Sequence, residues 1–290
     1  MTFTMFLLGL LYVVVVAGLI AYHVSIGFIL VVAGGLLFVQ YFFSDKMALY
    51  GMGGRVVTPE EAPELHGIVD RLCALADMPK PKVAIADTDI PNAFATGRNP
   101  NNAVVCATTG IMRRLNTEEL EGVLSHELSH VAHRDVAVMT FASFLGMCAG
   151  LITRFTYYSG LFGGFDDRDD RDGGAPAWIV ILLVSLLVYL ISFLLTRALS
   201  RYRELSADRS GALLTGRPSA LASALQKVTG DIARIPTRDL RQAEAFNAFY
   251  FTPAIANGFS ISSLFSTHPS LEKRLAQLAK ISVELGQPVA

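Results

Sequence analysis

The chain has 290 residues, of which 52% are apolar and 17% are charged, and its mean hydropathy of +0.45 is high for a water-soluble protein. A formal net charge of −1, without any basic cluster, argues against a nucleic-acid-binding protein. The cysteines Cys73, Cys106 and Cys148 are widely spaced and form no C-x-x-C pair. We therefore expect free thiols in a reducing compartment and no cysteine ligand to a metal.

Residues 1–45 are predicted to form a transmembrane hairpin. The runs 3–21 and 24–43 contain no charged residue, and each is long enough to cross roughly 30 Å of hydrocarbon as a helix. Only Tyr22 and His23 separate them. A cleaved signal peptide is the alternative for the first run, but this run lacks a basic start and a second span follows at once.

Residues 46–135 are predicted to form the first part of a soluble domain. Apolar residues at helical spacing predict a helix over 59–78. Short β-type runs follow, separated by turn sequences, at 82–86, 93–96 and 103–108. The simplest arrangement of these runs is a small antiparallel sheet.

The next predicted helix carries a motif with a specific chemistry. Asn116 and Glu119 have the spacing of a capping box, so the helix is expected to begin there. Its sequence His126-Glu127-Leu128-Ser129-His130 places two imidazoles on one helix face, within reach of a single metal ion. Glu127 can then contact a water on that metal, as in the H-E-x-x-H pattern of zinc metalloproteases. Because this pentapeptide also occurs on ordinary helices, a third ligand is needed to support the assignment.

Residues 136–197 are predicted to form a second transmembrane hairpin, with an Asp-rich outer loop at 166–172. The run 177–196 is unbroken and apolar, whereas the run 136–153 contains Ser143, Gly146 and Gly150 and could also be a buried soluble helix. Small residues are equally common where membrane helices pack. Pairing with the stronger run favours four spans in total.

Basic residues beside the spans predict the orientation. The loops inside the two hairpins contain few, whereas the opposite side carries Lys46, Arg55, Arg134, Arg197, Arg201 and Arg203. By the positive-inside rule, both termini and the soluble parts, including the metal motif, are cytoplasmic.

Residues 198–290 are predicted to form the second part of the soluble domain and to supply the third ligand. Glu204 and Asp208 lie four apart on a helix, so Glu204 could bind the metal while Asp208 accepts a hydrogen bond from a ligating histidine. An exposed acidic pair is the alternative, with ion pairs to Arg201, Arg203 or Arg209. The second hairpin favours the ligand interpretation, because its two ends should place this helix beside the motif helix.

Other histidines are weaker candidates. His133 is rotated away from the ligand face, so we expect it to have an interface role. His268 precedes Pro269, which suits the first position of a helix over 269–285, and a further helix is expected over 219–229.

Taken together, these motifs resemble the HtpX-type membrane zinc endopeptidases, which are relatives of the CAAX prenyl proteases. The matching segments occur in order over most of the chain, at 92–97, 126–130, 200–208 and 265–269. The resemblance implies an integral membrane α-helical protein of about four spans in the bacterial inner membrane. Its cytoplasmic zincin-like α+β metalloprotease domain would contain the small antiparallel sheet.

The resemblance also implies a role for each matching residue. It implies one zinc ion held by His126, His130 and Glu204, with Glu127 as catalytic base and Asp208 as the supporting carboxylate. His268 matches a histidine that helps to stabilise the transition state. The residues Asn92, Ala93, Phe94 and Ala95 match an edge strand that binds substrate, where an extended peptide could add to the sheet.

The expected activity is hydrolysis of membrane or unfolded proteins at the cytoplasmic membrane face, and the resemblance implies a role in quality control under stress. Processing of prenylated proteins is one alternative, although four spans are few for a large intramembrane chamber. A membrane scaffold with structural zinc is another, although such a site has no need of Glu127 as a base. The sequence predicts neither the natural substrates nor the oligomeric state.

Overall fold

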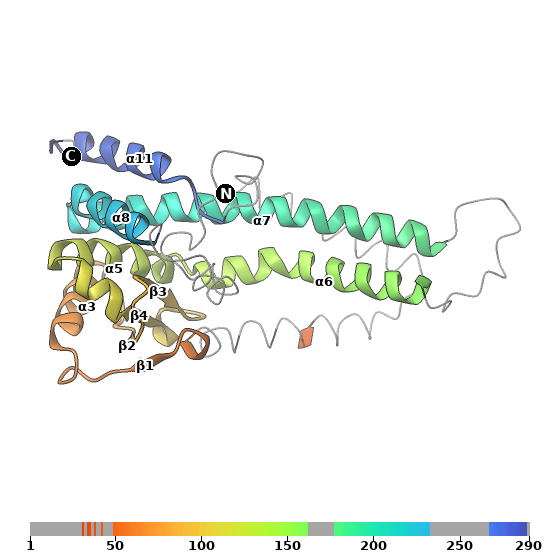
Figure 1. Ribbon diagram of the computed structural model, residues 1–290, viewed down its shortest axis with the longest axis horizontal. Helices are drawn as coiled ribbons and strands as arrows, with labels where there is room; N and C mark the ends of the chain where they lie inside the picture. Colours follow the sequence, from red (N-terminus) through yellow and green to blue (C-terminus); the bar gives the residue numbers. More distant parts are fainter. Residues whose placement is uncertain are drawn as a thin grey trace, which may run out of the picture. The chain divides into compact units, whose positions relative to one another are not determined.

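The computed structural model describes residues 49–161, 177–232 and 267–288, together with helical positions 31, 34, 35, 38 and 42 (Figure 1). The predicted span 3–21, most of the span 24–43 and the Asp-rich loop lie outside the described residues. The chain divides into two compact units. One contains Met1–Val39 and Val138–Leu199, and the other contains Gln40–Ala137 and Ser200–Ala290.

Two long helices, α6 (Asp135–Leu161) and α7 (Ala177–Thr215), run antiparallel where they belong to the first unit, from residue 138 of α6 and up to residue 199 of α7 (Figure 1). Thr153 Oγ1 donates to Ser185 Oγ at 2.9 Å, and Thr196 Oγ1 donates to the Ala142 carbonyl at 3.3 Å. Both helices were predicted, and the small residues of α6 lie at their contact, since a Cβ on Gly146 would lie 3.3 Å from Ser192 Cβ.

The apolar part of α7 has the exposure expected of a membrane helix. Leu183, Leu187 and Leu190 are 59%, 56% and 47% exposed, which is unusual for such side chains on one water-facing surface. Among the described residues, Ile179–Thr215 is the one helix long and apolar enough to cross a membrane, and the part Asp135–Gly150 of α6 is a shorter apolar helix. Four spans therefore remain a prediction.

The second unit contains a mixed sheet of β1 (Gly54–Val56), β2 (Lys82–Ala86), β3 (Ala93–Thr96) and β4 (Val104–Thr108). The strand order is β1-β2-β4-β3, with β4 parallel to β2 and antiparallel to β3. The prediction of an antiparallel sheet is therefore wrong. All five residues of β4 are buried, so this strand takes the centre of the sheet, as continuous apolar strands do. The segment between β2 and β4 is long enough for a crossover, which leaves β3 at the edge.

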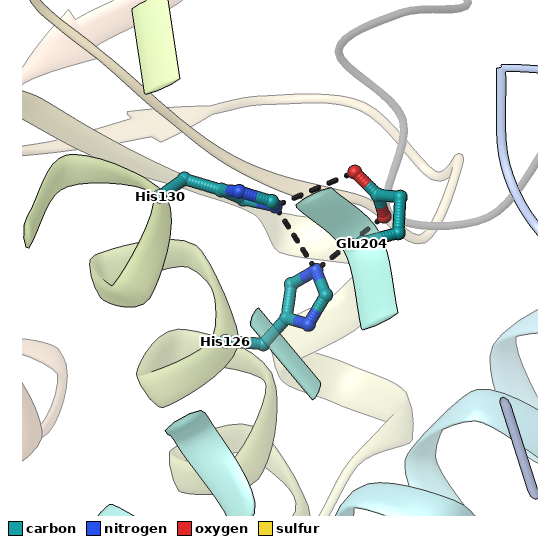
Figure 2. A group of neighbouring side chains, drawn as sticks. All are labelled: His126, His130 and Glu204. Carbon is teal, nitrogen blue, oxygen red and sulfur yellow. Dashed lines mark hydrogen bonds and ion pairs between the residues drawn. The ribbon is translucent and has the colours of Figure 1, made fainter. Parts of the chain in front are cut away.

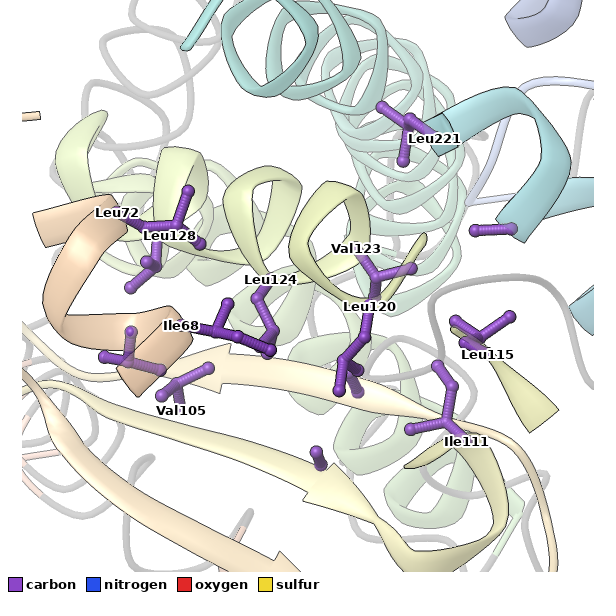
Figure 3. Packing of buried hydrophobic residues seen from close by; sticks show 14 of the residues in the cluster. Ile68, Leu72, Val105, Ile111, Leu115, Leu120, Val123, Leu124, Leu128 and Leu221 are labelled. Carbon is purple, nitrogen blue, oxygen red and sulfur yellow. The ribbon is translucent and has the colours of Figure 1, made fainter. Parts of the chain in front are cut away.

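Helices α3 (Pro63–Leu75) and α5 (Thr117–Ala132) supply the core on one face of this sheet. Figure 3 shows Leu124 and Leu128 of α5 packed with Ile68 and Leu72 of α3, close to Val105 of β4. Truncating one such leucine to alanine typically costs about 2–5 kcal/mol. This core fixes the position of the helix that carries the H-E-x-x-H motif.

The ends of the remaining helices are set by local capping. The predicted capping box of α5 is present, since Asn116 Oδ1 accepts from Glu119 N at 2.9 Å and Glu119 Oε2 accepts from Asn116 N at 3.0 Å. Helix α4 (Thr109–Arg114), which was not predicted, precedes α5 in the chain, and α8 (Pro218–Ile232) follows α7. Helix α11 (Leu271–Glu284) begins after Ser270, whose hydroxyl caps Lys273 N. Pro269 therefore lies before the helix, and its predicted place at the first helical position is wrong.

Helices α5 and α7 approach so closely that one glycine between them should resist substitution. A Cβ on Gly211 would lie 2.8 Å from His126 N and 2.9 Å from Ser125 Oγ. We expect Gly211→Ala to destabilise the protein by about 1–3 kcal/mol, since overpacking outweighs the helix-propensity gain. The matched control is Gly67→Ala on α3, where an added Cβ would lie within 4 Å of no atom outside its own stretch of helix. The free energy of unfolding of this variant should rise by up to about 1 kcal/mol. Denaturant unfolding of both variants checks this, and equal behaviour would contradict it.

Candidate metal centre

Three side chains from two helices converge on one point in the second unit. His126 and His130 come from α5, and Glu204 comes from α7 (Figure 2). His126 Nε2 lies 3.2 Å from His130 Nε2, and the Glu204 carboxylate lies 3.6 Å and 3.5 Å from these two nitrogens. Tetrahedral zinc ligands at about 2.0–2.1 Å from the ion are roughly 3.4 Å from one another. The donor set and its spacing thus fit a zinc ion with one open position.

The Nδ1 atom of each ligand histidine contacts an aspartate carboxylate. Asp208 Oδ1 lies 2.9 Å from His126 Nδ1, and Asp135 Oδ2 lies 2.6 Å from His130 Nδ1. A carboxylate at Nδ1 keeps the proton on that nitrogen, so that Nε2 presents its lone pair to a metal.

Each of these aspartates is in turn paired with an arginine. Arg274 of α11 donates to Asp208 through Nε at 2.7 Å and through a terminal nitrogen at 2.6 Å, and both residues are fully buried. Arg203 Nε lies 2.9 Å from Asp135 Oδ2. The centre therefore contains two chains of the same type, from histidine to aspartate to arginine.

Glu127 lies beside the ligands and against the edge strand. Its carboxylate is buried and accepts a hydrogen bond from Ala95 N at 3.1 Å. Burial raises the pKa of Glu127, and this increase is opposed by the nearby His126 and His130. A carboxyl group with a raised pKa beside a metal site is suited to take a proton from a water there and to give it up again.

The residues predicted to bind substrate are mostly buried. Asn92, Ala93 and Phe94 are no more than 2% exposed, and Phe94 packs in a second apolar cluster on the other face of the sheet. Ala95 is partly exposed. Any contact of β3 with a peptide would therefore use its backbone.

His268 and His133 have different surroundings. His268 Nδ1 lies 3.0 Å from Glu204 Oε2 and the residue is buried, so it joins the centre through the third ligand. His133 is the exposed C-cap of α5, and its Nε2 lies 3.4 Å from Ser210 Oγ of α7, away from the ligand group.

Comparison with known proteins assigns the family. Residues 59–282 match the model of peptidase family M48, a region that includes the three ligand residues and Glu127. The chain belongs to peptidase family M48.

Several curated HtpX proteases align with this M48 chain over nearly its whole length. Protease HtpX homolog 1 of Streptomyces coelicolor is 63% identical, over 99% of this chain and 93% of that protein. Protease HtpX homolog of Moorella thermoacetica is 57% identical, over 98% of this chain and 94% of that protein. The chain is thus related to the HtpX metalloproteases, as its motifs predicted.

A solved structure shares the fold. The crystal structure of S. mikatae Ste24p superposes with a TM-score of 0.57 at 19% identity, over 93% of this chain. This chain spans 62% of that longer protein.

The structure brings the predicted ligand residues of this M48 protease together and excludes the exposed acidic pair. Glu204 and Asp208 are buried, and the arginine on Asp208 is Arg274 rather than one of the three neighbours considered. Arg274 and Arg203 were not predicted as parts of the site, and Asp135 was a weaker candidate without a predicted role. Arg274 is 66 positions from Asp208, and the chain carries no local signal for that contact.

Metal binding to this site should depend on pH. Burial disfavours the charged form of His126 and lowers its pKa. Hydrogen bonds with Asp208 and Glu204 have a larger effect in the opposite direction, and the pKa of His126 is raised to about 9. Below this pH a metal must displace the proton on His126, so we expect metal affinity to rise by about tenfold per pH unit up to about pH 9. Zinc affinity by chelator competition between pH 6 and 9 checks this, and a flat profile would contradict it.

Proposed function

We propose that this M48 protease is a zinc-dependent endopeptidase that cleaves membrane or unfolded proteins at the cytoplasmic face of the bacterial inner membrane. One observation carries the proposal: three ligand side chains meet at the spacing of a zinc site, with the Glu127 carboxylate directly beside them. A purely structural zinc site would have no use for that carboxylate.

The roles of the residues follow from their positions. His126, His130 and Glu204 hold the metal, which when bound would polarise the scissile carbonyl and acidify the attacking water. Glu127 takes the proton from that water and delivers it to the leaving amine. Asp208 orients His126. His268 contacts Glu204, and from there it helps to stabilise the developing charge.

Substrate binding by the edge of the sheet is supported by the position of β3. This strand lies at one edge, and its Ala95 N–H points at Glu127. An extended peptide that pairs with this edge would pass directly by the base. Backbone pairing gives affinity with little demand on sequence, which suits unfolded substrates of varied sequence and a role in quality control under stress.

The location at the membrane is supported by the exposed apolar helix α7, and the cytoplasmic face is supported by the basic residues that follow its apolar part, Arg197, Arg201 and Arg203. Because α7 is continuous from its apolar part to Glu204, the site would lie near the bilayer surface. Glu204 follows Arg197 by seven residues, and a helix rises 1.5 Å per residue, so the two are about 10 Å apart along the helix axis.

The experiment is proteolysis by the detergent-purified full chain, with zinc content measured alongside. Unfolded and membrane-protein substrates should be cleaved by the wild type, and both Glu127→Gln and Glu204→Ala should be inactive. A prenylated peptide is tested in parallel, because prenyl-protein processing uses the same chemistry. Cleavage of that peptide alone would favour the processing enzyme, and an inactive zinc-loaded wild type would favour a scaffold.

A further inference from the structure

Asp135 contacts His130 through a geometry that a regular helix does not allow. The two residues are five apart, and at 3.6 residues per turn they would point about 140° apart on one continuous helix. Yet His130 Nδ1 lies 2.6 Å from Asp135 Oδ2. The backbone between them must therefore leave the helical path.

The departure occurs at Arg134, which has a φ of 55°. Helix α5 ends at Ala132, His133 is its C-cap, and α6 begins at Asp135. An arginine in the left-handed region costs about 1–2 kcal/mol relative to the right-handed region. Strained residues of this kind persist where the surrounding structure holds them, and they concentrate at functional sites.

A left-handed residue directly after the C-cap is a common way for a helix to end, but glycine or asparagine usually fills that position, whereas here it is Arg134. It is exposed, whereas Asp135 immediately after it is only 4% exposed. Asp135 lies between two partners, His130 Nδ1 and Arg203 Nε at 2.9 Å. The turn thus places the buried Asp135 carboxylate against His130, and the ion pair with Arg203 keeps that carboxylate in position.

We propose that the left-handed turn at Arg134 and the Asp135–Arg203 pair form a positioning device for His130. It matches the Asp208–Arg274 pair on His126, but it is built from a break between two helices instead of from one helix face. The device sets the orientation of His130 and thereby the affinity of the site for zinc. The inference goes beyond the proposed function, because its readout is metal binding and does not require that any substrate be cleaved.

The test compares two substitutions at Arg134 in the detergent-purified full chain. Glycine accepts the left-handed region without cost, so Arg134→Gly should bind zinc as the wild type does. A β-branched residue is a severe outlier there, so Arg134→Val should move Asp135 off His130 and weaken zinc binding by about 10–100-fold. The Co²⁺-loaded Arg134→Val protein should also show an altered d–d absorption spectrum, because a ligand has turned.

Asp77 offers a matched control for the backbone cost. It is exposed, follows α3 and has a φ of 48°. Asp77→Val should lose a similar amount of stability while zinc affinity and the Co²⁺ spectrum stay as in the wild type. Asp135→Asn, which keeps the shape but removes the charge, should weaken zinc binding with no change at Arg134.

Two results would overturn the proposal. One is an Arg134→Val protein with wild-type zinc affinity and an unchanged Co²⁺ spectrum. The other is an Asp77→Val protein that loses as much zinc affinity as Arg134→Val, since the effect would then be a general loss of stability. Failure of the wild type to cleave any substrate would count against the proposed function and would leave this inference unaffected.

Discussion

Replacing Glu127 by glutamine should stop peptide cleavage while zinc stays bound. Glutamine has the same shape as glutamate and can still accept the Ala95 N–H at the position where Glu127 accepts it. It cannot take a proton from water, so we expect kcat to fall by about 10²–10⁴-fold. The measurement is cleavage rate and zinc content on the same preparation.

Two further variants make this result specific. Glu204→Ala should lose both zinc and cleavage, because it removes one of three ligands. Glu121→Gln is the control for a change of charge on the same helix, since Glu121 is buried, pairs with Arg71 and Arg217, and is not one of the three ligand residues. It should keep both zinc and cleavage. Wild-type cleavage by Glu127→Gln would exclude Glu127 as the base.

The assembly of the ligand set was predictable because it depends on regular helical spacing. His126 and His130 are four apart, as are Glu204 and Asp208, and both pairs lie on the helices that were expected. The apolar run before Glu204 correctly indicated one continuous helix, α7. Periodic patterns of this kind predict the local secondary structure, and they do so without information about which elements pack against it.

The rest of the site depends on features that periodicity does not report. The contact between Asp135 and His130 requires a break in the helix at Arg134, and an arginine is not a residue that signals a left-handed turn. The central place of β4 in the sheet likewise depends on which strand buries both faces, and short apolar runs do not specify their neighbours. Contacts distant in sequence, such as that of Arg274 with Asp208, follow from packing alone.

Helix α11 is tied to α7 by several polar contacts, of which the one through Arg274 is the most buried. Gln277 Nε2 donates to the Leu205 carbonyl at 2.6 Å, and Arg209 pairs with Glu284 at 3.0 Å. Arg274 differs because it and Asp208 are at most 2% exposed, and because Asp208 also holds His126. Loss of Arg274 should therefore affect both the stability of the fold and the metal.

Arg274→Leu should lower the free energy of unfolding by about 3–5 kcal/mol, because it leaves the Asp208 carboxylate buried without its cation. Zinc affinity should fall by about 10–100-fold, because Asp208 then holds His126 less firmly. The matched control is Arg209→Leu, which breaks an ion pair between the same two helices whose side chains are 51% and 52% exposed. Exposed pairs contribute no more than about 1 kcal/mol, so this variant should unfold and bind zinc almost as the wild type does. Denaturant titration in detergent and chelator competition measure the two quantities. An Arg274→Leu protein that matches the Arg209→Leu protein in both would show that Asp208 holds His126 without help from α11.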